Sequence, residues 1–349
     1  MGMISSELPR ILILDTGGTI SQTAGADGSL VPCSTEYIEM VPRLHEIARL
    51  EVLRLERMDS SDMTAALRME MARLIYENYD NYEGFVVIHG TDTMVDTAAA
   101  LSYMLQDLGK PVVLTGAQLP IFAPGPDGLN NLFYSVQTAS MDLGEVVICF
   151  GDRILRGNRS LKENVHGFNA FHSFRVPALG ELGVTVQLLD HRIHRRESSP
   201  SLYPHLDSSV LYVTLTSGTT VSILESLLGA ADLRGLVLGC FGSGNLPAHE
   251  LPALKKILAR GVPVLVITTC LKGNTILSLY ASGRKVYNAG AREGLDLTPS
   301  AAVQKMMYAL GRIENEKPGL QGPARQQALY DLLTASVSMD MDESLRVSE

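Results

Sequence analysis

Three short segments that combine threonine with glycine have the composition of a site that binds and attacks a polar substrate. They are Asp15-Thr16-Gly17-Gly18-Thr19, Gly90-Thr91-Asp92-Thr93 and Thr115-Gly116-Ala117. Glycine lets a ligand approach backbone N–H groups closely, and threonine supplies a hydroxyl. A hydroxyl is a poor nucleophile at neutral pH and needs a neighbouring base or a lowered pKa. The segments therefore predict a hydroxyl-based site whose base has to be found elsewhere.

The residues beside the second segment offer only part of that base. His89 directly precedes Gly90, and at a strand end we expect it to pack or hydrogen-bond rather than serve in a triad. Asp92 can accept hydrogen bonds or hold a cation. A lysine desolvated in such a pocket can lose its proton and act as the base. The residues themselves do not select one lysine among those in the chain.

Other chemistries fit these segments poorly. Leu14-Asp15-Thr16-Gly17 resembles an aspartic-protease motif, but those enzymes are all-β and pair two such carboxylates, whereas here one copy stands in a β-α context. Gly17-Gly18-Thr19 matches neither phosphate-loop pattern. The four cysteines are widely spaced and form no CxxC pair, so we expect reduced thiols rather than disulfides or zinc. We expect no metal and no cofactor.

The three segments each follow a predicted buried strand. Continuous apolar runs predict strands at residues 10–15, 85–89, 112–114 and 145–150, and helical spacing predicts helices at 63–79, 93–108 and 130–139. Thr93 and Asp96 stand at capping-box spacing. This alternation predicts a parallel sheet with helices on both faces. Ligands bind outside the carboxyl ends of such strands, so we expect the three segments to meet at one edge.

The length of 349 residues suggests two α/β domains. We expect a larger N-terminal parallel-sheet domain at residues 1–190 that carries the catalysis, and a polar linker with two prolines at 191–209. A smaller C-terminal Rossmann-like α/β domain follows at 210–349, with strands at 210–215, 235–239 and 263–268 and a last helix at 299–310. From about Met339 we expect a frayed polar tail.

The charge pattern and apolar runs exclude some classes of partner. The net charge is −9, from 29 basic and 38 acidic residues, and no basic stripe is present, so we expect no nucleic acid. No apolar run reaches the ~18 residues of a membrane span, so we expect no membrane partner. No signal peptide is visible, and we expect a cytoplasmic protein.

The first two segments, with the residues around them, resemble a known family. Thr16-Gly17-Gly18-Thr19-Ile20 and His89-Gly90-Thr91-Asp92-Thr93-Met94 look like the paired signatures of the bacterial-type L-asparaginases. The segments at residues 59–63, 111–117 and 156–162 are similar to family segments, and residues 294–310 resemble the closing helix of the cytoplasmic, type I branch. The resemblance covers about residues 11–311.

The resemblance implies catalytic roles. Thr19 matches the threonine that attacks the side-chain amide carbon of L-asparagine. Thr91, Asp92 and Lys162 match a second group in which Lys162 activates Thr91. The secreted branch carries an activating tyrosine in the lid that follows the nucleophile, but the corresponding segment here, residues 21–32, has none. We expect that segment to be a lid, and Tyr280 to be the candidate replacement.

The resemblance also implies the binding positions. Ser60 and Ser61 match positions that hold the substrate α-carboxylate, with Asp59 beside them, and Asp92 matches the position that binds the α-ammonium. Gly18 and Ala117 are further expected substrate contacts. Asn245 matches a residue that family members borrow from the second domain of a neighbouring subunit. A homodimer or homotetramer is therefore expected.

The function expected from this likeness is hydrolysis of L-asparagine to L-aspartate and ammonia through a threonine nucleophile and an acyl-enzyme. Two alternatives stay open: an amino-acid sensor without catalysis on the same fold, and a hydrolase of another amide or ester, such as glutamine or a lysophospholipid. Some cytoplasmic relatives bind asparagine at an allosteric site with threonine where this chain has Leu161, which argues against allostery, although Cys270 matches another position of that site.

Overall fold

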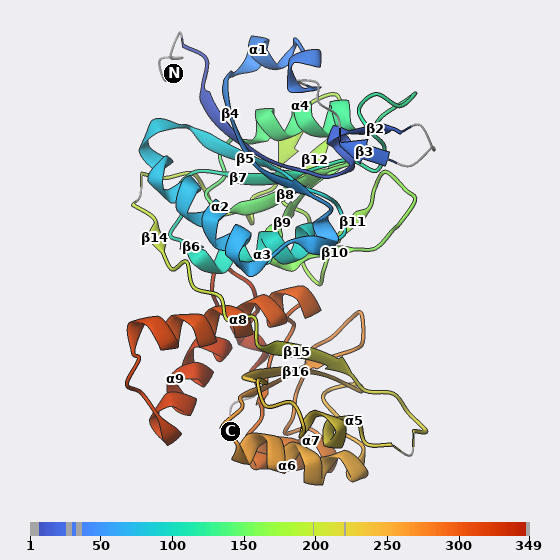
Figure 1. Cartoon of the computed structure of the whole chain (residues 1–349), viewed down its shortest axis with the longest axis vertical. Helices are drawn as coiled ribbons and strands as arrows, with labels where there is room; N and C mark the ends of the chain where they lie inside the picture. Colours follow the sequence, from blue (N-terminus) through green and yellow to red (C-terminus); the bar gives the residue numbers. More distant parts are fainter. Residues whose placement is uncertain (1–6, 26–29, 33–36, 198, 220, 347–349) are drawn as a thin grey trace. The chain divides into compact units, whose positions relative to one another are not determined.

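The computed structural model describes residues 7–25, 30–32, 37–197, 199–219 and 221–346. The chain divides into two compact units, Met1–Pro204 and His205–Glu349, which Figure 1 colours from blue through green and from yellow to red. The segment expected to link the domains, residues 191–209, packs along the first unit over much of its length. Ile193 N–H donates to Glu145 Oε1 at 2.7 Å, and Gly144 N–H donates to the carbonyl of Ile193 at 2.8 Å.

An eight-stranded sheet with order β13-β12-β9-β8-β7-β5-β1-β4 forms the centre of the first unit. Five strands from one edge run parallel, and the other three continue the sheet antiparallel. The parallel strands are β4 (Arg49–Met58), β1 (Arg10–Gly17), β5 (Gly84–Ile88), β7 (Val112–Thr115) and β8 (Val146–Phe150). The others are β9 (Arg153–Arg156), β12 (Gly180–Leu182) and β13 (Val186–Leu188).

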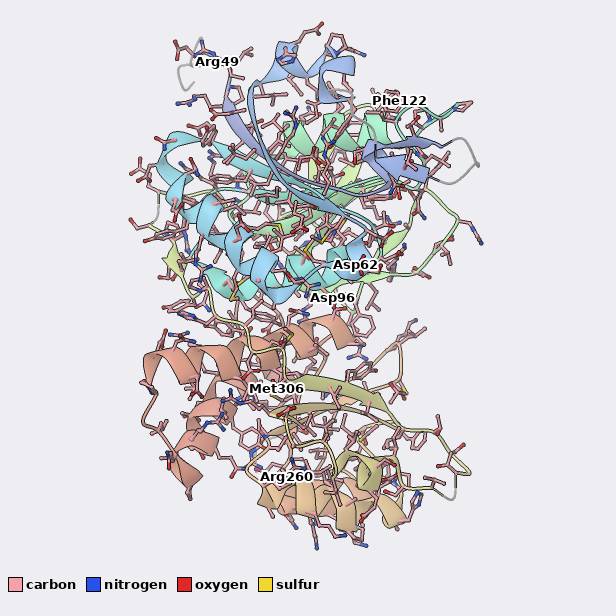
Figure 2. All side chains as sticks on the ribbon, in the orientation of Figure 1. Arg49, Asp62, Asp96, Phe122, Arg260 and Met306 are labelled. Atoms are coloured by element: carbon pink, nitrogen blue, oxygen red, sulfur yellow. The ribbon has the colours of Figure 1, made fainter. Side chains whose placement is uncertain are left out.

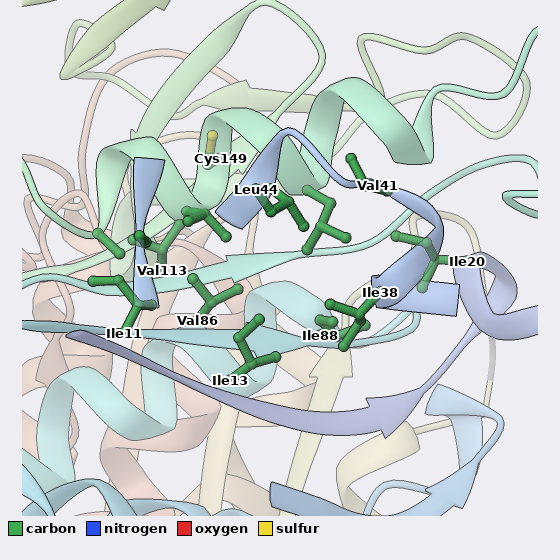
Figure 3. Close-up of a cluster of buried hydrophobic side chains, with 14 of the residues drawn as sticks. Ile11, Ile13, Ile20, Ile38, Val41, Leu44, Val86, Ile88, Val113 and Cys149 are labelled. Carbon is green, nitrogen blue, oxygen red and sulfur yellow. The ribbon is translucent and has the colours of Figure 1, made fainter. Parts of the chain in front are cut away.

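Helices cover both faces of this sheet, as predicted for parallel strands that are apolar throughout. Figure 1 shows α1 (Leu44–Ile47) and α4 (Gly128–Thr138) on one face, and α2 (Ala65–Glu77) and α3 (Met94–Met104) on the other. Alternate strand residues share a face, so Ile11, Ile13, Val86, Ile88 and Val113 gather in the core beneath α4 (Figure 3).

Short elements complete the first unit. They are β2 (Gln22–Ala24), β3 (Leu30–Pro32), β6 (Leu105–Gln106), β10 (Ser160–Lys162), β11 (Phe171–Ser173), β14 (Ser201–Leu202) and the 3-10 turns Thr19–Ser21, Tyr37–Met40, Ser60–Asp62, Tyr79–Asn81 and Gly157–Arg159. Strand β2 pairs with β3, β10 with β11 and β6 with β14, all antiparallel.

The second unit is built on a four-stranded parallel sheet, which agrees with the smaller α/β domain expected from the sequence. Its strands, in order, are β15 (Val210–Thr214), β16 (Gly235–Cys240), β17 (Val264–Thr268) and β18 (Arg292–Glu293). Its helices are α5 (Ile223–Leu227), α6 (Leu251–Ala259), α7 (Ala281–Ala289), α8 (Pro299–Glu316) and α9 (Gly322–Thr334), with 3-10 turns at Ala248–Glu250 and Glu343–Leu345. Figure 2 shows Arg260, just past the end of α6, and Met306 on α8.

Three local expectations were wrong. The predicted helix at residues 93–108 ends at Met104, because Leu105 turns extended and begins β6. The Thr93 hydroxyl makes no cap bond and instead donates to the Ser60 carbonyl at 2.6 Å; Asp62 and Asp96 in Figure 2 mark the two segments that this bond joins. The tail is not frayed at Asp340, which is fully buried and pairs with the fully buried Lys305 at 2.7 Å.

Candidate active site

The ends of the first two predicted strands pack backbone against backbone. Gly18 has φ of +86° and ψ of −178°, a region open essentially to glycine. A methyl carbon on Gly18 would lie 2.6 Å from the Cα atom of Gly90, so no other residue fits without a backbone shift. The Thr16 hydroxyl ties the same two strands by donating to the Ile88 carbonyl at 2.8 Å. This packing brings the half-buried Thr19, which follows Gly18, to the segment that holds Thr91.

The turn after β4 meets the same point from another side. A methyl carbon on Gly90 would lie 2.7 Å from both Cβ and Oγ of Ser60, which is buried. Asp59 and Ser61 on either side are exposed. The Ser61 N–H and hydroxyl donate to Asp59 Oδ1 at 2.9 and 2.7 Å, and these bonds lower the pKa of the Asp59 carboxyl. Ser60 therefore contacts the strand ends, and its neighbours border them.

Lys162 joins this site from the end of β10. Its Nζ atom donates to Thr91 Oγ1 at 2.8 Å and to Asp92 Oδ1 at 2.5 Å. The Lys162 side chain is 16% exposed and that of Asp92 is 64% exposed, while Thr91 is buried. A neutral amine at this position would be in hydrogen-bond reach to accept the Thr91 proton. The structure thus brings together three residues that only the family resemblance had singled out as a group.

The third threonine-glycine segment adds a residue that the sequence analysis did not select. Ala117 is buried, and the next residue, Gln118, has its Oε1 atom 3.5 Å from the Thr91 hydroxyl. The Gln118 Nε2 atom donates to the carbonyls of Val165 and Gly167 at 3.1 and 3.2 Å, in the loop that follows Lys162. Gln118 therefore links the Thr91 segment to the Lys162 loop; its position directly after the third segment was the available signal.

Asp15 serves the turn below Thr19 rather than a protease-like pair. Its side chain is 1% exposed; Oδ1 accepts the Gly17 N–H at 2.9 Å, and Oδ2 accepts Arg57 Nη2 at 2.7 Å. Tyr37 lies against this pair, with the Arg57 guanidinium 5.9 Å from its ring centre. Burial, and then the Asp15 charge, raise the pKa of Tyr37 well above its ordinary value. Arg57 was missed because its strand was not predicted.

Two expected site residues, Asn245 and Tyr280, belong to the second unit. Asn245 Oδ1 accepts the Ser282 hydroxyl at 2.5 Å. Tyr280 precedes α7 as its N-cap and is 55% exposed. The two residues thus share the region at the start of α7, and their part in the active site stays a prediction.

The expected lid at residues 21–32 contains a small antiparallel pair. Strand β2 pairs with β3, with Gln22 opposite Pro32 and Thr23 opposite Val31. Residues 26–29 of this segment lie outside the described residues.

Among the described residues, no helix is both long and apolar enough to cross a membrane.

Comparisons with known proteins match both units of the chain to one family. The family model for the N-terminal domain of asparaginase matches residues 10–194, and that for the glutaminase/asparaginase C-terminal domain matches residues 209–318. L-asparaginase 1 of Escherichia coli (strain K12) is 34% identical over 312 residues, which cover 86% of this chain and 92% of that protein. The 60 kDa lysophospholipase of Mus musculus is 36% identical over 292 residues, which cover 82% of this chain and 50% of that protein.

A solved structure gives the same result. The crystal structure of L-asparaginase I from Vibrio cholerae O1 biovar eltor str. N16961 superposes with a TM-score of 0.85 at 32% identity, covering 96% of this chain and 100% of that one. The resemblance read from the two threonine-glycine signatures is confirmed, as is the expected class of enzyme. The chain belongs to the asparaginase family and is an amidohydrolase.

Proposed function

We propose that the chain is an L-asparaginase that converts L-asparagine and water to L-aspartate and ammonia. The observation that supports this best is the contact of Lys162 with both Thr91 and Asp92, next to the backbone packing of Gly18 on Gly90. That arrangement joins a hydroxyl, an amine and a carboxylate, and Thr19 follows Gly18 directly in the chain; a hydroxyl nucleophile with a neighbouring base is what attack on a carboxamide needs.

The reaction runs through an ester on Thr19. The Thr19 oxygen forms a bond to the side-chain amide carbon as its proton leaves, which gives a tetrahedral oxyanion. The C–N bond then breaks, and the nitrogen takes up the proton that left Thr19 and departs as ammonia. Water attacks the resulting ester, the bond to Thr19 breaks, and aspartate and the free hydroxyl are released. Lys162 activates the Thr91 hydroxyl in this scheme. Backbone N–H groups near Thr91 stabilise the oxyanion.

The charged ends of asparagine account for the remaining residues. Ser60 and Ser61, with Asp59 beside them, hold the α-carboxylate. Asp92, whose carboxylate is 64% exposed, accepts the α-ammonium. Gly18 and Ala117 complete the binding site through their backbone.

A second copy of the chain is part of this proposal. Asn245 and Tyr280 would reach the site from the second domain of a neighbouring subunit, in a homotetramer built from intimate dimers or in a homodimer. Tyr280 would assist Thr19, since the sequence of residues 21–32 contains no tyrosine. The cytoplasmic location stays a prediction.

Ammonia release from the purified protein with millimolar asparagine tests the proposal. Thr19→Val keeps the shape of the side chain and removes the attacking oxygen, so we expect the fold to persist and turnover to fall at least 10²-fold. Thr185→Val, an exposed threonine of the first unit, is the matched control and keeps parental activity. Near-parental activity of Thr19→Val would exclude Thr19 as the nucleophile.

The same assay separates the alternatives. Asparagine binding by calorimetry without turnover would identify a sensor. A kcat/KM for glutamine equal to that for asparagine would overturn the substrate choice, because a site sized for asparagine penalises one extra methylene by roughly 1–3 kcal/mol. Fatty-acid release from lysophosphatidylcholine, without ammonia release from asparagine, would favour the activity named for the mouse relative.

A further inference from the structure

Behind Thr91, a chain of three hydrogen bonds crosses the buried interior from α2 to the end of β5. Arg68 Nε lies 3.1 Å from Thr97 Oγ1, Thr97 Oγ1 lies 2.9 Å from His89 Nε2, and His89 Nδ1 lies 2.7 Å from the Gly90 carbonyl oxygen. His89 and Thr97 are fully buried, and Arg68 is 7% exposed. None of these side chains belongs to the set that the family resemblance placed at the site.

The two ends of this chain fix its direction. A guanidinium has only donors, so Thr97 Oγ1 must accept from Arg68. A carbonyl oxygen has only lone pairs, so His89 Nδ1 must carry a proton and donate to Gly90. His89 Nε2 is then the acceptor of the Thr97 hydroxyl, because burial lowers the pKa of His89 to about 4 and keeps the ring neutral. Every bond in the chain therefore points towards the Gly90 carbonyl.

The receiving peptide group is the one that joins Gly90 to Thr91. When a carbonyl accepts a strong hydrogen bond, electron density moves towards its oxygen and the N–H of the same peptide becomes a better donor. The cooperative gain in hydrogen-bond strength is about 10–30% per bond. That N–H belongs to Thr91, whose hydroxyl contacts Lys162. Within the described ranges, the structure shows no backbone carbonyl that accepts the Thr91 N–H.

We propose that His89 is a positioning residue that holds and polarises the Gly90–Thr91 peptide, with Thr97 and Arg68 fixing its tautomer from behind. The proposal rests on the proposed function in one respect, namely that the Thr91 N–H donates to the oxyanion. Burying a guanidinium and an imidazole costs free energy unless their polar atoms are paired. Aliphatic side chains would fill the same buried volume without that cost. The paired network serves the peptide rather than packing alone.

Nitrogen NMR of histidine-labelled protein tests the direction of these three hydrogen bonds independently of turnover. The ring of His89, assigned by its disappearance in His89→Gln, should show a protonated Nδ1 and a bare Nε2 at pH 7. A proton on Nε2, or a charged ring, would overturn the proposal whatever the activity. If the parental enzyme released no ammonia from asparagine while His89 showed the expected tautomer, only the proposed function would fail.

Thr97→Val tests the consequence for catalysis. It keeps the shape of the side chain but removes the hydroxyl between Arg68 and His89, so we expect kcat to fall about tenfold with KM for asparagine within twofold. Thr97→Ser retains the hydroxyl and should restore kcat to within twofold. Thr138→Val, at a fully buried threonine on α4, is the matched control with unchanged kcat. An equal fall in kcat in Thr97→Val and Thr97→Ser would show a merely structural role. A rise in KM with kcat unchanged would show the same.

Discussion

Replacement of Lys162 by methionine should separate catalysis from stability. Methionine keeps the apolar stem, which is mostly covered, and removes the Nζ atom that lies 2.8 Å from Thr91 Oγ1 and 2.5 Å from Asp92 Oδ1. A positioned general base contributes typically 10²–10⁴-fold to a rate. We therefore expect kcat for asparagine to fall about 10³-fold, which corresponds to roughly 4 kcal/mol of activation free energy.

The stability effect of the same change should be small. Because the Asp92 side chain is 64% exposed, its ion pair with Lys162 is largely screened by solvent and contributes at most about 1 kcal/mol to the free energy of unfolding. For a unit of this size, that amount shifts Tm by about 2–4 °C. The predicted signature is thus a near-native Tm with nearly complete loss of turnover.

Ammonia release measured through a coupled glutamate dehydrogenase assay, together with thermal unfolding, checks both parts. Lys256→Met is the matched control, since Lys256 pairs with Glu225 at 2.9 Å on the surface of the second unit; it should keep parental kcat. If Lys162→Met retained kcat within fivefold of the parent, Lys162 would not activate Thr91. A large drop in Tm would show that the exposed pair is worth far more than its geometry implies.

Three further changes follow from the packing around the site. The pKa of His89 is about 4 in the folded protein, against 6.5 for a free histidine. Because the folded pKa is the lower one, the unfolded chain takes up the proton first as the pH falls. The free energy of unfolding therefore decreases by about 3 kcal/mol between pH 6.5 and 4. Urea unfolding at both pH values should show this loss, and His89→Gln should lack it. Gly18→Ala places a methyl carbon 2.6 Å from Gly90 Cα, so we expect kcat to drop at least tenfold, and parental kinetics would mean that the strand ends yield freely. Arg57→Gln leaves Asp15, 1% exposed, without its cation, which should cost about 3 kcal/mol; the double variant with Asp15→Asn should recover most of that in denaturant titrations, and no recovery would argue against the pair.

The sequence predicted the strands that are buried on both faces and missed the strand at the edge. Strands β1, β5, β7 and β8 are continuous apolar runs, which parallel strands between two layers of helices require. Strand β4 alternates exposed and partly buried residues at the end of the sheet order. Its arginines and glutamates alternate with apolar residues, which is a period-two strand pattern, but the strand predictions rested on continuous apolar runs, so residues 49–58 were missed.

Local sequence pattern and the family resemblance together predicted part of the site. The threonine-glycine endings follow from strand positions, and the contact of Lys162 with Thr91 follows from the resemblance alone, because 71 positions separate the two residues. Arg57 and Arg68 reach their partners across 42 and 29 positions. No local pattern encodes such contacts, so their roles emerge only when the elements are folded together.

The buried pair of Lys305 and Asp340 makes the segment around Asp340 part of the folded second unit. Lys305 Nζ also donates to the Ala335 carbonyl at 2.6 Å, and the Val337 N–H donates to Asp340 Oδ1 at 2.8 Å. A shortened clone that stops before Asp340 would leave an ammonium group in the dry interior without its counterion, at a cost of several kcal/mol. Affinity tags joined after the last residue keep this anchor, whereas trimming the polar C-terminus to aid crystallisation would remove it.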